Sequence, residues 1–135
     1  MISTRELKKC SLERDVLTAE CGAYLSQLIN EMKKKNLGGF EFTTGVPVTV
    51  GGAVTMNFGA HGGQISDLVV EALIIRPDGS TETWSKDQLQ MSYRTSRIQT
   101  EPVCVAQAKF KLELTAAEEI QKRVDALNEK RWATQ

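Results

Sequence analysis

Hydrophobic and polar residues alternate near the end of the chain. Apolar residues occupy every second position there, namely Cys104, Ala106, Ala108, Phe110, Leu112 and Leu114. The residues between them include Gln107, Lys109, Lys111 and Glu113. A period of two over this length is typical of an antiparallel strand with one face exposed to water. The pattern therefore predicts one strand over residues 104–114.

Two earlier segments also read as strands. The run Asp15–Cys21 is β-prone and stops at Gly22. Residues 68–77 are apolar and β-branched, and Asp78-Gly79 follows them. Asp-Gly is a strong signal for a tight hairpin turn, so we expect Ser80–Trp84 to return as the partner strand.

Helical spacing appears in two places. The apolar residues Tyr24, Leu25, Leu28, Ile29 and Met32 fall on one helical face. Lys33–Lys35 would lie in the last turn, where cations complement the helix dipole, and Gly38-Gly39 would end the helix. This lysine run is better explained as a solvated helix end than as an anion site.

The second helix is predicted near the C-terminus. Thr115 and Glu118 have the spacing of a capping box, and Ile120, Val124 and Leu127 form a narrow apolar stripe after it. Ser85 and Gln88 have the same capping spacing and predict one further short helix. Strands and helices are mixed without regular alternation, and no linker divides the chain. We therefore expect one α+β domain over residues 1–135, with a mostly antiparallel sheet flanked by helices.

Composition narrows the class of protein. The 135 residues carry 17 basic and 17 acidic side chains, and this balance disfavours a nucleic-acid partner. No apolar run reaches the roughly 20 residues of a membrane-spanning helix, and the first residues lack the apolar core of a secretion signal. The three cysteines are odd in number and far apart, so we expect reduced thiols and a cytoplasmic protein.

The centre of the chain is rich in glycine. Eight of the ten glycines lie between Gly38 and Gly63, and apolar residues are interleaved with them. One interpretation is a set of tight turns with closely packed backbone. The other is a loop whose backbone amides approach a phosphate. The common dinucleotide and P-loop fingerprints are both absent, so the residues alone leave these two interpretations open.

Two motifs then resemble a known family. The first runs through Gly45-Val46-Pro47, Thr49-Val50-Gly51-Gly52-Ala53, Met56-Asn57 and Gly59-Ala60, and it is similar to the FAD-binding signature of UDP-N-acetylenolpyruvylglucosamine reductases, the MurB family. The second, Tyr93-Arg94-Thr95-Ser96, looks like the Tyr-Arg-x-Ser motif of that family. The resemblance extends from about Val16 to the end of the chain. It implies the second FAD-binding subdomain of the MurB and vanillyl-alcohol-oxidase type of flavoprotein.

The resemblance implies a chemistry and a set of contacts. In that family NADPH reduces bound FAD, and the flavin reduces the enolpyruvyl ether of a UDP-sugar to UDP-N-acetylmuramate for peptidoglycan. The residues implied to line FAD are Gly45, Val46, Pro47, Thr49, Val50, Gly51, Gly52, Ala53 and Asn57. Thr49 would donate from its hydroxyl, and Gly51 and Gly52 would admit the backbone.

The second motif supplies the implied catalytic residue. Arg94 would stabilise negative charge on the substrate carboxylate through paired hydrogen bonds, a geometry that lysine lacks. Taken alone, an arginine at this point is more simply a surface ion pair. Tyr93 would orient Arg94 or contact the substrate, although a half-buried core tyrosine fits equally well. His61, where the family usually has tyrosine, is a further candidate for substrate contact, and no Cys/His cluster predicts a metal site.

The family pattern is incomplete in this sequence. A first flavin-binding domain would precede Met1, and residues 115–135 resemble the helix that exits toward a third domain carrying the proton donor. Val48 replaces a usual glycine, and Phe58 replaces a usual alanine. The alternative to part of a reductase is therefore a non-catalytic module that binds FAD weakly or not at all and associates with itself or with a partner that supplies the missing domain.

Overall fold

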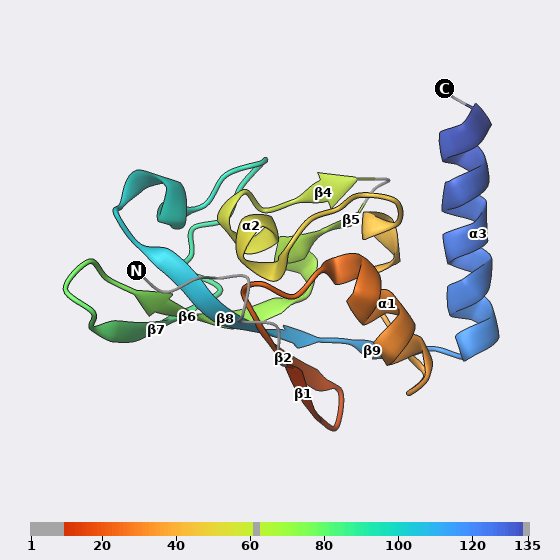
Figure 1. Ribbon diagram of the computed structural model, residues 1–135, viewed down its shortest axis with the longest axis horizontal. Helices are drawn as coiled ribbons and strands as arrows, with labels where there is room; N and C mark the ends of the chain where they lie inside the picture. Colours follow the sequence, from red (N-terminus) through yellow and green to blue (C-terminus); the bar gives the residue numbers. More distant parts are fainter. Residues whose placement is uncertain (1–9, 61–62, 134–135) are drawn as a thin grey trace.

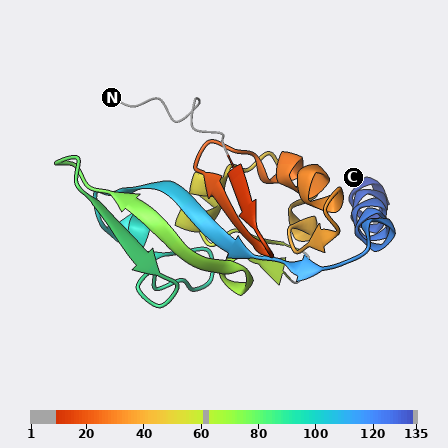
Figure 2. The same cartoon turned by 90° about the horizontal axis from the view of Figure 1, so that it is seen from below.

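A five-stranded antiparallel sheet forms the base of the molecule (Figures 1 and 2). The computed structural model describes residues 10–60 and 63–133. Its strands follow the order β1, β2, β8, β6, β7 across the sheet, and every neighbouring pair is antiparallel. Their bounds are β1 Cys10–Glu13, β2 Val16–Glu20, β6 Val69–Ile75, β7 Thr81–Ser85 and β8 Cys104–Lys111. The predicted α+β class and the predicted β6–β7 hairpin are confirmed.

One face of the sheet is the floor of the hydrophobic core. Leu17 pairs with Phe110 and Ala72 pairs with Ala108, and all four side chains are buried. Phe40 packs edge-on against Phe110, with ring centroids 5.1 Å apart. The opposite face is polar, and Lys109 pairs there with Glu71 at 3.2 Å between nitrogen and oxygen. This division follows from the period-two pattern, as expected.

The strand predicted over residues 104–114 is interrupted twice. A register shift between Leu73 and Ile74 places Ile74 opposite Val105, so Val105 is buried and Cys104 is exposed. A β-bulge of this kind changes which residues of a strand face inward. At the other end Leu112 donates its amide to Asp15 and leaves the ladder. Residues Glu113–Leu114 then form β9, which pairs with β3 Leu37–Gly38 in a separate small sheet.

Helix α1 (Leu25–Lys33) covers part of the core face, with Leu25, Leu28, Ile29 and Met32 buried. The predicted stop at Gly38-Gly39 is wrong. The turn after the helix closes at Asn36, which adopts the left-handed φ of 58°. Asparagine tolerates this conformation because its short side chain bonds locally, so it replaces the expected glycine. Its side-chain oxygen also accepts the amide of Ala117.

The other two helices are α2 (Val50–Thr55), which lies over the sheet, and α3 (Ala117–Ala133), which stands beside the domain beyond β9 (Figure 1). The predicted Thr115 capping box is absent, because the Thr115 hydroxyl donates to the carbonyl of Glu113. Ile120 is the buried anchor of α3. The short helix predicted after Ser85 is a turn, although Ser85 and Gln88 exchange both capping hydrogen bonds.

Short elements complete the face that carries α2. They are η2 Glu41–Thr43, β4 Gly59–Ala60, β5 Gly63–Gln64, η3 Ile65–Asp67 and η4 Arg97–Thr100. Phe58, which directly precedes β4, stacks on Phe42 with ring centroids 6.2 Å apart. A ring at this position therefore has a packing role that the usual alanine would not supply.

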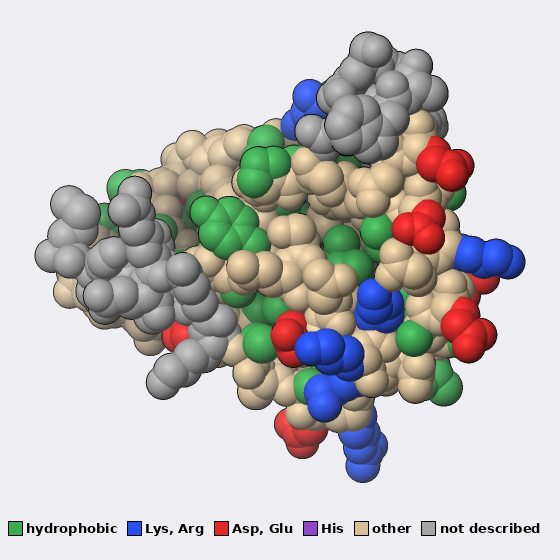
Figure 3. All heavy atoms as spheres, turned by 45° about the vertical axis from the view of Figure 1, so that its right-hand side comes forward, with side chains coloured by type: hydrophobic (Ala, Val, Ile, Leu, Met, Phe, Trp, Pro, Cys, Tyr) green, Lys and Arg blue, Asp and Glu red, His purple; other side chains and the backbone are tan. Residues whose placement is uncertain are grey.

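The surface mixes both signs of charge. Acidic and basic side chains lie among one another on the face shown in Figure 3. Among the described residues, no helix has the length and apolar character needed to cross a membrane.

Candidate functional site

The glycine-rich signature forms a short helix, α2, and its glycines are not an open loop. Thr49 is its N-cap, and the Thr49 hydroxyl oxygen accepts the amide of Gly52 at 3.2 Å. The amides of Val50 and Gly51 donate to the carbonyls of Ala23 and Cys21 at 2.8 and 3.0 Å. These three amides are therefore engaged inside the chain, which favours closely packed backbone over phosphate-facing amides at these positions.

The Thr49 hydroxyl keeps its own proton. A threonine hydroxyl has one donor hydrogen besides its acceptor lone pairs. Among the described residues no hydrogen bond donated by this hydroxyl is seen, and its predicted contact with FAD stays a prediction. The neighbouring Thr55 hydroxyl differs, because it donates back to the carbonyl of Gly51 at 2.7 Å.

Gly51 is required by close packing between α2 and the end of β2. A Cβ atom added at Gly51 would lie 3.0 Å from the Cβ of Cys21 and 3.4 Å from the Cys21 carbonyl oxygen. The same atom added at Gly52 would meet only the Thr49 hydroxyl at 3.3 Å and a methyl of Val48 at 4.0 Å. The two glycines thus serve different purposes. Gly51 lets α2 pack against the end of the strand. Gly52 leaves the outward side of the helix without a side chain.

A hollow of about 180 Å³ lies on that outward side. Its lining consists of Cys21, Thr49, Gly51, Gly52, Thr55, Cys104 and Val105. Three of the predicted cofactor residues, Thr49, Gly51 and Gly52, therefore share one concave surface. Burial, together with the nearby Cys104, raises the pKa of the Cys21 thiol, so this wall is uncharged at neutral pH.

The remaining predicted cofactor residues are not part of the lining of this hollow. Gly45 has a φ of 80° and, with Val46 and Pro47, belongs to the loop that leads to Thr49. Val50 and Ala53 are fully buried, so their side chains hold α2 to the core. Val48, which stands where the family usually has glycine, does not adopt a positive φ, and its side chain packs on the core. This backbone therefore accommodates valine.

The second motif is a tight hairpin with Tyr93 and Arg94 at its tip. Ser92 and Thr95 exchange backbone hydrogen bonds at 3.0 and 3.1 Å. Tyr93 is 82% exposed, so it is not a core tyrosine. The Arg94 guanidinium lies 5.4 Å from the centre of the Tyr93 ring, and no described carboxylate pairs with it. Both side chains are thus presented to solvent next to each other.

Arg94 has a φ of 54°, a left-handed conformation that costs a non-glycine residue about 1 to 2 kcal/mol. Two buried side chains hold the hairpin in this shape. Asn57 donates to the carbonyl of Ser92 at 2.8 Å, and the Ser96 hydroxyl donates to the carbonyl of Thr55 at 2.5 Å. Asn57 and Thr55 lie at the C-terminal end of α2. The hairpin of the second motif is therefore attached to the C-terminal end of α2, the helix that the first motif forms.

Asn57 offers a direct test of this attachment. Its side-chain oxygen also accepts the amide of Ser66 at 2.9 Å, and its own φ is 44°. Asn57→Gly keeps the backbone conformation, leaves the Ser66 amide without its partner and removes one of the two hydrogen bonds to the Ser92 carbonyl, so we expect a loss of about 1 to 3 kcal/mol in unfolding free energy. Urea denaturation measures it. Arg14→Gly, at an exposed turn with φ 58°, is the matched control and should change stability by less than about 1 kcal/mol. Equal changes in the two variants would show that Asn57 does not hold the hairpin.

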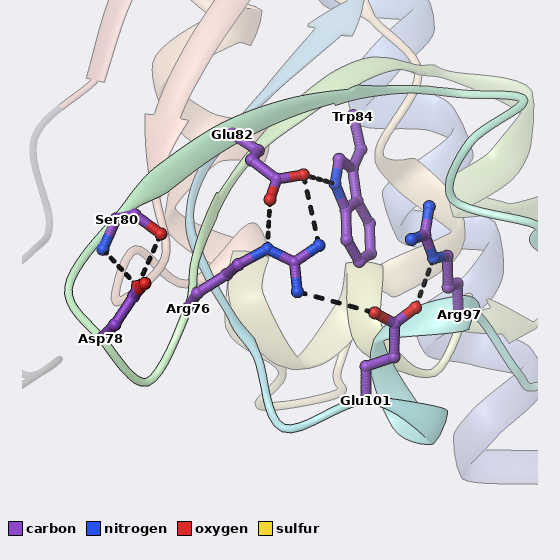
Figure 4. Close-up of polar contacts among 7 residues, drawn as sticks. All are labelled: Arg76, Asp78, Ser80, Glu82, Trp84, Arg97 and Glu101. Atoms are coloured by element: carbon purple, nitrogen blue, oxygen red, sulfur yellow. Dashed lines mark hydrogen bonds and ion pairs between the residues drawn. The ribbon is translucent and has the colours of Figure 1, made fainter.

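A charged network braces the segment that follows the hairpin (Figure 4). The Arg97 guanidinium lies 4.0 Å from the centre of the Trp84 ring and pairs with Glu101. Glu101 also faces Arg76, which pairs with Glu82, and Glu82 accepts the Trp84 indole N–H at 3.1 Å. The hydrogen bond from Arg76 lowers the pKa of Glu82 to about 2. Glu82 therefore keeps its charge across the neutral range, and the network ties the Arg94 hairpin to β6 and β7.

Some predicted features are not brought into the site. His61 lies outside the described residues. No group of three or more metal-ligating side chains occurs among the residues that the structure describes. Sequence reasoning missed Cys21 and Cys104, which line the hollow although 83 positions separate them. The pairing of β2 with β8 brings them together, and only the register of those strands would have revealed it.

Comparisons with known proteins agree with this geometry. A family model described as "FAD binding domain" matches residues 1–85. A UDP-N-acetylenolpyruvoylglucosamine reductase of Clostridium botulinum (strain Hall) is 40% identical over 135 residues, which cover 100% of this chain and 44% of that protein. The chain thus spans less than half the length of the curated relatives that it matches.

Solved structures share the fold. The reductase MurB from Thermus caldophilus superposes with a TM-score of 0.77 at 29% identity, covering 84% of this chain and 42% of that one. A glucooligosaccharide oxidase from Acremonium strictum superposes with a TM-score of 0.60 at 21% identity, covering 78% and 23%. The predicted likeness to the central FAD-binding domain of MurB is therefore confirmed. The chain belongs to the family of FAD binding domains, and FAD is the cofactor of that family.

Proposed function

We propose that this chain is the FAD-binding part of an NADPH-dependent reductase that converts UDP-N-acetylenolpyruvylglucosamine to UDP-N-acetylmuramate in peptidoglycan synthesis. The observation that carries the proposal is the attachment of both motifs to α2. The hollow runs along this helix from Thr49 to Thr55, and the Arg94 hairpin is hydrogen-bonded to its C-terminal end. One rigid element thus sets the distance between a cofactor surface and a cation.

The residues fit part of a flavin dinucleotide. Thr49 would donate its hydroxyl hydrogen to the cofactor, and Gly52 would let it approach the helix closely. The hollow is far smaller than the whole cofactor, so it would hold one portion. FAD, when bound, supplies the hydride chemistry. Its remaining contacts would come from the portion of the longer relatives that lies outside this sequence.

Arg94 would act on the substrate. Its guanidinium is solvent-exposed, has no carboxylate partner in the described part of the chain, and stands beside the Tyr93 ring. It is therefore free to form paired hydrogen bonds with a carboxylate, and these strengthen as negative charge accumulates there. Tyr93 would orient it by providing the ring surface on which it rests. Proton delivery would fall to another segment, toward which α3 would lead.

The absorbance and fluorescence of flavin test the first half of this proposal. Purified chain mixed with FAD should quench flavin fluorescence saturably, and complementation with the remaining segments of a longer relative should restore NADPH oxidation that depends on the enolpyruvyl sugar. A folded chain that leaves flavin fluorescence unchanged and restores no turnover would reject the proposal. It would instead support a non-catalytic module that associates with itself or with a partner.

A further inference from the structure

Two cysteine thiols line the hollow at α2. Cys104 is exposed at the start of β8, and Cys21 is buried with 5% of its surface exposed. Both share the lining with Thr49, Gly51 and Gly52. A side chain attached to Cys104 would therefore compete for the same space as a ligand held by Thr49. This arrangement has no role in the reductase chemistry proposed above.

We propose that Cys104 is a reversible modification site, at which a small-molecule disulfide forms a mixed disulfide that fills the hollow and excludes the flavin cofactor. The inference rests on the proposed cofactor site. In the step, the Cys104 thiolate attacks one sulfur of the small disulfide, and a new sulfur–sulfur bond forms as the old one breaks. The other half leaves as a thiolate and takes up the proton that Cys104 released.

The two cysteines differ in reactivity. The thiolate is the reacting form, so an exposed thiol reacts ahead of one that is buried. Burial raises the pKa of Cys21, which leaves little of its thiolate at neutral pH. The Cys21 amide is also bound to the carbonyl of Ala106 at 2.9 Å, and the Gly51 amide donates to the Cys21 carbonyl. Cys21 is thus fixed in the wall, and an adduct on Cys104 outlasts any exchange with it.

Size supports exclusion of the cofactor. The hollow of about 180 Å³ corresponds to roughly six water molecules at their liquid volume. A hydroxyethylthio or pyridylthio group occupies much of that space. Because Gly52 carries no side chain, the adduct can lie directly against α2, where the Thr49 hydroxyl would otherwise meet a ligand.

The test uses the full chain with Cys10→Ser, because Cys10 is also exposed. Dithiodipyridine should release one equivalent of thiopyridone rapidly, and Cys104→Ser in the same background should abolish that phase. The adduct should weaken FAD binding by about tenfold or more, and a reducing dithiol should reverse the effect. Saturating FAD should slow the rapid phase by a similar factor. Thiopyridone release is followed by absorbance, and FAD binding is followed by quenching of flavin fluorescence.

Three outcomes separate this inference from the function on which it rests. If FAD binds and the Cys104 rate is unchanged by it, the inference is overturned and the cofactor site stands. If both thiols are consumed and mass spectrometry finds a Cys21–Cys104 disulfide without a retained adduct, the inference is also overturned. If the unmodified protein does not bind FAD, the proposed function is rejected, and the inference is rejected with it because it depends on that function.

Discussion

Arg94→Gly is expected to lower turnover of the complete reductase by about 100-fold or more while leaving the domain at least as stable as the parent. Loss of a hydrogen-bond donor to developing charge typically costs about 100- to 1,000-fold in rate. Glycine at the same position relieves the left-handed strain of about 1 to 2 kcal/mol, offset by the greater freedom of glycine in the unfolded chain. Steady-state kinetics and urea denaturation measure the two effects.

Two controls sharpen that result. Arg14→Gly changes the same residue type at nearly the same φ, 58° against 54°, in the exposed turn between β1 and β2. It should match Arg94→Gly in stability and leave turnover at the parental value. Arg94→Lys keeps the charge and loses the planar fork, so it should recover only part of the rate. Unchanged turnover in Arg94→Gly would remove this residue from the reaction.

Gly51→Ala and Gly52→Ala are expected to affect stability in opposite directions. The new methyl at Gly51 would stand 3.0 Å from the Cβ of Cys21 and push α2 off the end of β2. Such overpacking costs about 1 to 3 kcal/mol and outweighs the helix-propensity gain of alanine. At Gly52 the methyl would meet only the Thr49 hydroxyl closely, at 3.3 Å, and a small shift of that side chain relieves the contact, so part of the gain of up to about 1 kcal/mol should be expressed.

The affinity for FAD should not rise and fall with the stability of these two variants. The Gly52 methyl projects beside the Thr49 hydroxyl in the lining of the hollow, so the more stable variant should bind FAD about tenfold or more weakly. Thermal denaturation and titration of flavin fluorescence give both quantities on the same sample. A Gly52→Ala protein with parental FAD affinity would place the cofactor elsewhere on the domain.

The strands were predictable because their information is local. Alternation identified β8, and Asp78-Gly79 identified the hairpin of β6 and β7. The bulge that buries Val105 was not predictable, because it depends on the register between Ile74 and a partner strand about 30 positions away. The caps failed for a similar reason. Asn36, distant in sequence, accepts the amide of Ala117 at the start of α3, whereas local spacing had predicted a cap by Thr115 and Glu118.

For the candidate site, the residue types could be predicted from the sequence, but their arrangement in space could not. Glycine spacing and the Tyr-Arg-x-Ser pattern identified Thr49, Gly52 and Arg94 from the sequence. Their relation to each other came only from the fold, because Asn57 and Ser96 join two segments that are about 40 residues apart. The role of Gly51 was likewise hidden, since its neighbour Cys21 belongs to another element.

The short helix α2 also has a consequence for how this domain can vary. Each residue in an α-helix adds about 1.5 Å and turns the chain by roughly 100°. One inserted or deleted residue between Thr49 and Asn57 would therefore swing the Arg94 hairpin around the helix axis relative to the Thr49 hollow. The number of residues in this stretch therefore sets the orientation of the Arg94 hairpin relative to the Thr49 hollow. A substitution that preserves the helix would leave that orientation unchanged, whereas an insertion or deletion would alter it.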